Sequence, residues 1–193
     1  MSKTRLEAFS DGVIAILITI MVLELKVPHG SSWEAVRPTV FTLLLYLLSF
    51  VFLGIYWSNH HHMFHAIQKV NGAVLWANLH LLFWLSLVPF ATAWMGENHF
   101  TALPTAIYGV VLVAAAIAYT ILQQTLITQH GRGSTLAIAV GGDLKGKMSI
   151  ACYLAGIGLA FVHPLIADAL YTTVALMWLV PDKRIESRLT HES

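Results

Sequence analysis

Apolar residues gather in six runs along the chain, and short polar segments separate them. A transmembrane helix needs about 20 largely apolar residues, and fewer where its polar ends sit at the interface. Each run therefore predicts one membrane-spanning helix, the first of which we expect to begin near Glu7. The six runs cover residues 13–25, 40–56, 73–95, 106–127, 148–162 and 164–180.

Only His163 and Pro164 separate the last two runs. One kinked helix over 148–180 would be about 50 Å long at about 1.5 Å per residue, which exceeds a bilayer core. Proline can also end one helix and occupy the first turn of the next. The pattern therefore favours six spans over five.

The basic residues divide unequally between the two sides that six spans create. One side receives Lys26 and Arg37 only. By the positive-inside rule the richer side is cytoplasmic, so both termini are expected in the cytoplasm and a five-span chain is disfavoured. That richer side holds nine of the eleven basic residues: Lys3, Arg5, Lys69, Arg132, Lys145, Lys147, Lys183, Arg184 and Arg188.

Composition agrees with the bilayer as solvent. Of 193 residues 57% are apolar and only 11% charged, with a mean hydropathy of +0.71, whereas soluble domains carry about 25% charged residues. The net charge of +1 gives no electrostatic case for nucleic acid binding. Cys152 is the single cysteine, so the chain forms no internal disulfide. We expect a membrane domain at 1–181 and a short cytoplasmic tail at 182–193.

The first helix carries polar residues before its apolar part. Ser10 and Asp11 can cap a helix N-terminus, where the helix dipole also favours a negative charge, and Arg5 can anchor the helix at the membrane interface. Ionisable groups near a membrane helix can instead face protein or water rather than lipid. At about 100° per residue, Ile16, Ile20 and Leu23 form one apolar stripe along the helix, with Thr19 on its edge. Asp11 lies well over 90° around the helix from the centre of this stripe. The stripe has two interpretations, ordinary packing or a pore lining.

A histidine cluster follows the second run, at its cytoplasmic end. His61 and His65 are spaced to share a helical face and could bind a metal, yet no second cluster completes a site, so we expect no metal. One or two of these histidines could instead pair with Asp11, because the depths match. The third interpretation is a polar interfacial segment with aromatic neighbours.

Other polar features are fewer. Asn78 and His80 lie inside the third run and can form hydrogen bonds between helices. Residues 131–146 are polar and glycine-rich, which predicts a flexible loop. Gly156 and Gly158 are expected to permit close helix contact.

Two motifs resemble those of the transmembrane protein 175 family of potassium channels. The first is Arg5-x-x-x-Phe9-Ser10-Asp11 followed by Ala15-Ile16-x-x-Thr19, and the second is Trp57-x-Asn59-His60-His61-x-x-Phe64. The segment from Ser86 to Phe90 also resembles the family's third helix. The resemblance covers residues 5–92 in sequence and the remainder by helix count.

The resemblance implies a potassium channel without a carbonyl selectivity filter, and with potassium as the permeant ion and no cofactor. It implies that Ile16, Ile20 and Leu23 constrict the pore and that Thr19, with Ile16, contributes to selectivity. One six-helix repeat per chain implies a homotetramer around a central pore in the cell (inner) membrane. A network that holds the pore helix would comprise Arg5, Phe9, Ser10, Asp11, His60 and His61.

Two other functions are weighed against a channel. A transporter or proton pathway could use Asp11 with His60 and His61, although no broken helices or paired internal repeats support it. A histidine-metal membrane enzyme is the other candidate, and the missing ligands argue against it. The sequence predicts a channel with no catalytic residues.

Overall fold

The computed structural model describes residues 2–179, apart from the side chain of Pro38, and within that range it is helical without strands. This confirms the all-α class predicted from the sequence. The predicted tail at 182–193 lies outside the described residues. The helices are α1 (Lys3–Leu23), α2 (Trp33–His65), α3 (Gly72–Ser86), α4 (Val88–Glu97), α5 (Ala102–His130), α6 (Thr135–Val140), α7 (Leu144–Ala160) and α8 (Pro164–Leu179).

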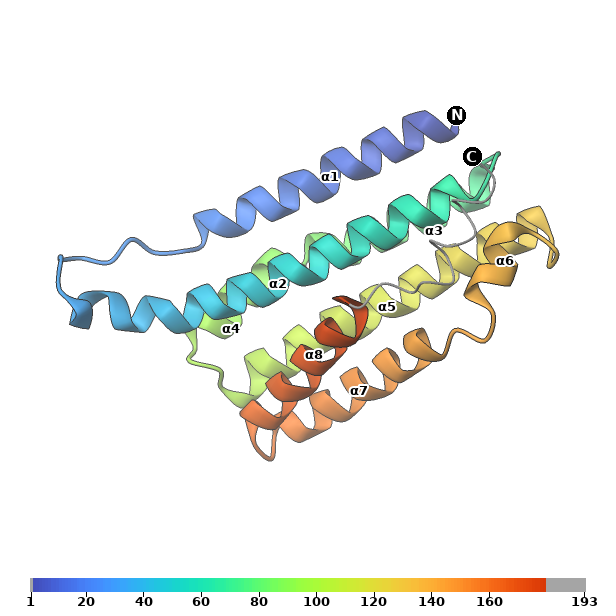
Figure 1. Ribbon diagram of the computed structural model, residues 1–193. Helices are drawn as coiled ribbons and strands as arrows, with labels where there is room; N and C mark the ends of the chain where they lie inside the picture. The colour runs from blue at the N-terminus through green and yellow to red at the C-terminus, as the bar shows by residue number, and fades with distance from the viewer. Residues whose placement is uncertain (1, 180–193) are drawn as a thin grey trace.

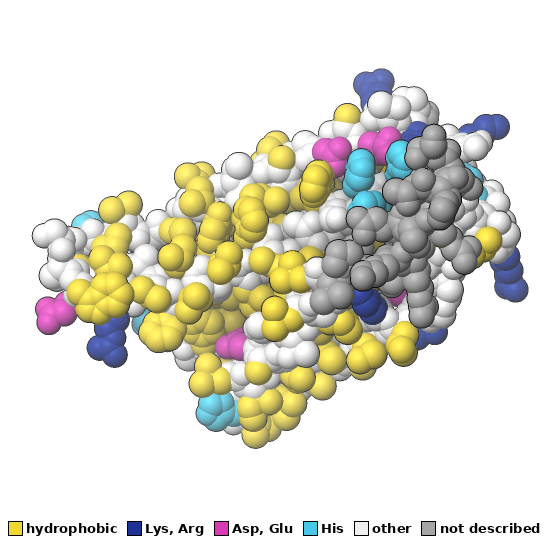
Figure 2. All heavy atoms as spheres, in the orientation of Figure 1, with side chains coloured by type: hydrophobic (Ala, Val, Ile, Leu, Met, Phe, Trp, Pro, Cys, Tyr) yellow, Lys and Arg dark blue, Asp and Glu magenta, His cyan; other side chains and the backbone are white. Residues whose placement is uncertain are grey.

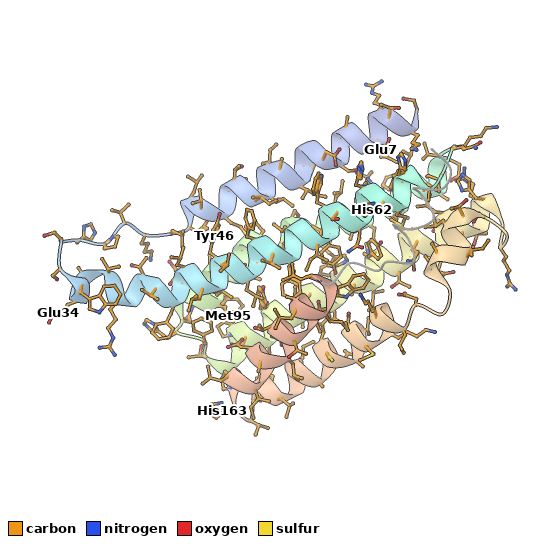
Figure 3. All side chains as sticks on the ribbon, in the orientation of Figure 1. Glu7, Glu34, Tyr46, His62, Met95 and His163 are labelled. Carbon is orange, nitrogen blue, oxygen red and sulfur yellow. The ribbon has the colours of Figure 1, made fainter. Side chains whose placement is uncertain are left out.

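The long helices run back and forth along one common direction (Figure 1). Glu7 and His62 lie at one end of the bundle, whereas Glu34 and His163 lie at the other (Figure 3). The helix α1 lies at the edge of the bundle and packs on α2, α3 and α4, while α5 packs on α3, α7 and α8. The alternating directions are those that six passes require.

Among residues 2–179, four segments are long and apolar enough to cross a membrane, namely α1, α2, α5 and the α3–α4 pair. Helices α7 and α8 have 17 and 16 residues, about 24–26 Å at 1.5 Å per residue, slightly short of an average core. The chain is a multi-pass membrane protein, and its exact number of spans stays a prediction. The separation predicted at His163-Pro164 is confirmed, because Pro164 is the first residue of α8.

Several helix ends differ from those predicted. The helix α2 extends beyond the apolar run at both ends and includes the histidine cluster as its last turns. The third run is two helices, because the chain breaks at Leu87, two residues before Pro89. The expectation of a plain loop at 131–146 is wrong, since Ser134 caps a short helix there, α6.

Polar side chains fix where the helices begin. Ser2, Ser32, Asn71 and Ser134 each accept a hydrogen bond from a backbone N–H of the first turn, which satisfies a donor that the helix itself leaves free. Asp143 does the same for α7 from a left-handed conformation, with φ of 45°. Each cap lies before the apolar part of its helix or, for Ser134, at the start of the short helix α6.

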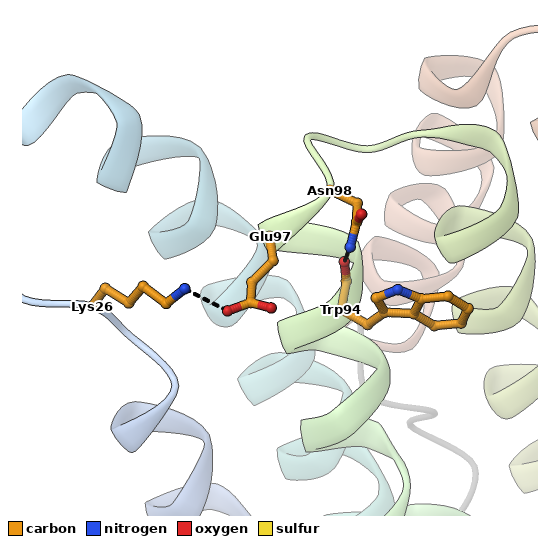
Figure 4. Close-up of polar contacts among 4 residues, drawn as sticks. All are labelled: Lys26, Trp94, Glu97 and Asn98. Atoms are coloured by element: carbon orange, nitrogen blue, oxygen red, sulfur yellow. Dashed lines mark hydrogen bonds and ion pairs between the residues drawn. The ribbon is translucent and has the colours of Figure 1, made fainter.

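The surface of the bundle is apolar along its length and charged at its ends. Figure 2 shows hydrophobic side chains covering α1, α2 and α8, whereas most lysines and arginines gather at the end that holds the start of α1. At the opposite end Lys26 forms an ion pair with Glu97, with Nζ and Oε1 2.6 Å apart (Figure 4). The hydrogen bond and charge of Glu97 raise the pKa of Lys26. This pair ties the segment after α1 to the end of α4.

Helix α7 approaches α8 closely because of one glycine. A Cβ on Gly156 would collide with the ring of Tyr171, which is fully buried, and a Cβ on Gly109 of α5 would meet the same side chain. Gly158 faces open space instead. The sequence therefore predicted the close contact correctly at Gly156 and wrongly at Gly158.

This difference gives a stability prediction. Gly156→Ala should destabilise the protein by about 1–3 kcal/mol, because the added methyl forces Tyr171 to move in a packed interior. Gly158→Ala, two residues along the same helix, should be neutral or stabilising, since alanine favours helices by up to about 1 kcal/mol. Thermal unfolding of the purified protein in detergent measures both, and equal midpoints would contradict the packing described here.

Candidate functional site

The candidate site joins the start of α1 to α2 and α3. Ser10 is the one polar residue on the buried face of α1, which otherwise consists of Leu6, Ile14, Leu17 and Met21. These residues recur at intervals of three and four, so they form one stripe that packs on the bundle. The polar motif and the apolar face of α1 therefore lie against the same neighbours.

A chain of hydrogen bonds connects three helices through Asn78. The His60 Nε2 and the Asn78 Oδ1 are 2.8 Å apart, and the Asn78 Nδ2 donates to the Ser10 Oγ at 2.9 Å. Ser10 donates in turn to the backbone carbonyl of Leu6 at 2.9 Å. All three side chains are buried. Because a carbonyl oxygen only accepts, His60 carries its proton on Nε2 and is held as one tautomer.

The other face of the His60 ring is apolar. The ring stacks on Phe64 with centroids 4.4 Å apart, and its Nδ1 is buried without a hydrogen-bond partner among the described residues. His60 therefore forms its side-chain hydrogen bond through Nε2 alone, as a donor to Asn78.

Asp11 contacts α2 through an indole and not through a histidine. The Trp57 Nε1 donates to the Asp11 Oδ1 at 3.0 Å. His61 stacks on Trp57, with centroids 6.3 Å apart, and on His65, at 6.2 Å. The direct pairing of Asp11 with one of the histidines that matching depth suggested is thus replaced by a contact with Trp57. Asp11 does lie on the side of α1 away from the exposed Ile16, as the helical geometry predicted.

Arg5 and Phe9 take no part in this arrangement. The Arg5 side chain is exposed, and its backbone N–H donates to the Ser2 Oγ; Phe9 is 49% exposed. A contact that the sequence did not predict occurs nearby, where Lys3 Nζ donates to the carbonyl of Ile67 at 2.9 Å. The motif thus has two sides, one bound to the bundle and one facing outward.

The predicted pore residues all lie on the outward side of α1. Ile16, Ile20 and Leu23 are 57%, 40% and 79% exposed. Thr19 is exposed too, and its hydroxyl donates to the carbonyl of Ile16 at 2.8 Å. That bond uses the only proton of the hydroxyl, so its oxygen remains available as an acceptor.

No group of three or more metal-ligating side chains lies together in residues 2–179. His61 and His65 are side by side, as their spacing predicted, but no third ligand joins them. Asn78 and Trp57 are the two residues of this site whose contacts with α1 were not predicted from the sequence. Each has a usable signal, since a polar side chain inside or beside a membrane span needs a partner.

Fold and site together define an all-helical, multi-pass membrane protein whose first helix is anchored on one face and open on the other. The family model described as endosomal/lysosomal potassium channel TMEM175 matches residues 5–89. A protein named potassium channel from a Chryseobacterium species is 56% identical over 189 residues, which is 98% of each chain. The chain therefore belongs to the TMEM175 family, a family of ion channels and not of enzymes.

Two further relatives extend the comparison. The crystal structure of a lysosomal potassium-selective channel TMEM175 homolog from Chamaesiphon minutus superposes with a TM-score of 0.80 at 27% identity, covering 93% of this chain and 97% of that one. The human protein named endosomal/lysosomal proton channel TMEM175 is 34% identical over 103 residues, 47% of this chain and 20% of its own length. This chain therefore matches only about a fifth of the human protein.

The hydrogen-bonded chain generates a prediction. Asn78→Ala should lower stability by about 1–3 kcal/mol, because the buried His60 Nε2 loses its partner, whereas Ser10 Oγ keeps its bond to the Leu6 carbonyl. Asn98→Ala is the matched control, because Asn98 is exposed and its side chain binds only the Trp94 carbonyl of its own turn (Figure 4). Thermal unfolding in detergent compares the two; an Asn78 variant as stable as the Asn98 variant would contradict the bridging role.

Proposed function

We propose that this chain forms a potassium-selective channel in which four copies of α1 line a central pore. The observation that carries the proposal is the two-sidedness of α1. One face is fixed to the bundle by Ser10 and Asp11, and the opposite face exposes Ile16, Ile20 and Leu23. An apolar stripe at the edge of a subunit is free to face an axis shared with other copies. The bacterial relative named potassium channel and the potassium-selective homolog support the ion.

The conduction path in this proposal is a hydrophobic constriction. A narrow ring of isoleucine side chains expels water, and an ion that enters without water loses its hydration energy. Ile16 forms the narrowest ring, with Ile20 and Leu23 further along the pore. Thr19, whose hydroxyl oxygen is available as an acceptor, contributes oxygen ligands beside the constriction and so favours potassium.

The orientation in this proposal follows from charge. The end of the bundle with Lys3, Arg5 and Lys69 faces the cytoplasm under the positive-inside rule, and the Lys26–Glu97 pair faces the outside. In this proposal the homotetramer lies in the cell membrane with both termini on the inner side.

A proton pathway is the second candidate function, because the human relative is named a proton channel. In its simplest form protons would pass along His60, Asn78 and Ser10. The hydrogen bonds weigh against that route. The Asn78 amide lies between the His60 imidazole and the Ser10 hydroxyl, and Ser10 already donates its proton to a backbone carbonyl. Conduction through the α1 pore needs no such relay.

Flux measurements test the leading proposal. Liposomes containing the purified protein and a potassium gradient, with no coupling ion, should show passive potassium flux that exceeds sodium flux. Ile16→Asn should increase the flux, by about tenfold for each 1.4 kcal/mol removed from the barrier, because a polar ring stays hydrated. Ile121→Asn, at an exposed residue of α5, is the matched control and should leave flux unchanged. Absence of potassium flux would overturn the proposal.

Proton flux separates the two functions. With a pH-sensitive dye inside the same liposomes, a potassium gradient should drive potassium without obligatory proton exchange. His60→Ala and His61→Ala should leave proton flux unchanged if the histidines only position α1. A fixed ratio of protons to potassium that disappears in either variant would favour the proton-coupled alternative.

A further inference from the structure

One carboxyl group is buried in the bundle near the start of α8. It belongs to Asp168, which follows Pro164, the first residue of the helix, at the end of the bundle that holds His163 (Figure 3). Both of its side-chain oxygens are buried without a hydrogen-bond partner among residues 2–179. Buried polar atoms without a partner are rare in proteins, so two such atoms on one carboxyl group need a physical explanation.

The surroundings of Asp168 are apolar. Asp168 borders a groove between α2 and α8, and the residues by which α2 and α4 line this groove are all apolar, buried Met95 among them. Figure 2 shows this face of the bundle as largely hydrophobic. The two carboxyl oxygens are not open to the groove, because each of them is buried. They therefore lie in a setting that does not solvate a negative charge.

The ionisable side chains on the elements around Asp168 do not pair with it. The tyrosine hydroxyl protons nearest in the fold are used elsewhere: Tyr108 contacts Ser49 at 2.9 Å, and Tyr171 donates to the backbone carbonyl of Thr105 at 3.3 Å. No lysine or arginine lines the groove. The ionisable residues are His99 of the α4–α5 connection, Tyr108 of α5, Tyr153 of α7, His163 of the α7–α8 turn and Tyr171 of α8.

We propose that Asp168 is a proton switch, which holds a proton while α8 is packed and whose ionisation loosens α8 from α2 and α5. Burying a charge costs far more than burying a neutral polar group, so an apolar setting without donors or positive charges favours the neutral carboxyl group. The ionised form recovers its solvation only if its oxygens reach water, which requires α8 to move. Packing of α8 and release of the proton to water therefore oppose each other.

The position of Asp168 assigns the switch to one side of the membrane. Asp168 and Pro164 are about 6 Å apart along α8 at 1.5 Å per residue, so the proton exchanges with the side on which α8 begins. Under the orientation proposed above that side is the outside, and acid there keeps α8 packed. The switch itself needs no particular orientation and does not involve the exposed stripe of α1.

Thermal unfolding of the whole protein in detergent between pH 5 and pH 8 tests the proposal. A group that binds its proton more tightly in the folded chain than in the unfolded chain makes stability fall as the pH rises. Relative to Asp168→Asn, the unmodified protein should lose about 3–6 °C of unfolding midpoint for each pH unit over which only the folded chain keeps the proton. Glu34→Gln, at an exposed acid of α2, should keep the pH dependence of the unmodified protein.

Two further variants make this comparison decisive. Histidine also titrates in this range, so Asp168→Asn should have the same effect in a His99→Gln background. Asp168→Leu leaves no polar side-chain atom at this position and should remove the same pH dependence, which decides the test if Asp168→Asn does not fold. A pH dependence that survives in the folded variants would overturn the proposal. Lower stability of both variants at pH 8 would do the same, because it would assign a stabilising partner to the carboxylate.

The movement of α8 has its own readout. Ala175 of α8 is 2% exposed, so Ala175→Cys in a Cys152→Ser background places a buried thiol on this helix. At pH 8 the thiol should react faster with a water-soluble maleimide than it does when Asp168→Asn is added. Comparing the two proteins at one pH removes the effect of the thiol's own ionisation. Equal rates would contradict the proposed loosening of α8.

Discussion

The hydrogen bonds of Asn78 are the interaction on which the position of α1 depends. Inside a bilayer no water satisfies a polar side chain, so each one needs a partner within the protein. Asn78 uses its oxygen toward His60 and its nitrogen toward Ser10, which joins α1, α2 and α3 at one depth. Shifting α1 along its axis or rotating it would separate Ser10 from Asn78 in a place where neither finds a replacement. The outward direction of the opposite face is a consequence of this constraint.

The apolar runs located the long helices because burial in lipid requires length and hydropathy, and both are visible in a sequence. The apolar runs did not show where a helix ends when its last turns consist of polar residues. The histidine cluster at the end of α2 is helical, since histidines at an interface neither break a helix nor need lipid. The break at Leu87, two residues before Pro89, was not predicted, because proline can kink a membrane helix without ending it. Ser134 and the short helix α6 gave no periodicity to read.

At the site, helical geometry alone predicted that Asp11 turns away from the Ile16 stripe, and the structure agrees. It could not identify the partner. Matching depth favoured the histidines, yet the indole of Trp57 lies next to Asp11 and donates to it. Depth constrains one coordinate only, and the rotation of α2 about its own axis decides which side chain faces α1. That rotation is set by tertiary packing, such as the burial of His60 and Phe64, which no single sequence displays.

Two buried polar contacts of helix α2, those of His60 and Ser49, lie far apart along it, and their separation divides the subunit into parts. His60 connects α2 to α3 and, through Asn78, to α1, whereas Ser49 connects it to α4 and α5 through Thr92 and Tyr108. The two residues are about 16 Å apart along the helix at 1.5 Å per residue. The Ser49 contacts hold the scaffold together without involving α1. The helix α1 is held separately, by the contacts of Ser10, Asp11 and Lys3 at one end, by its buried face along α2, α3 and α4, and by the Lys26–Glu97 pair that follows it. The helices α5, α7 and α8 pack on one another, so this part of the subunit has a packing of its own.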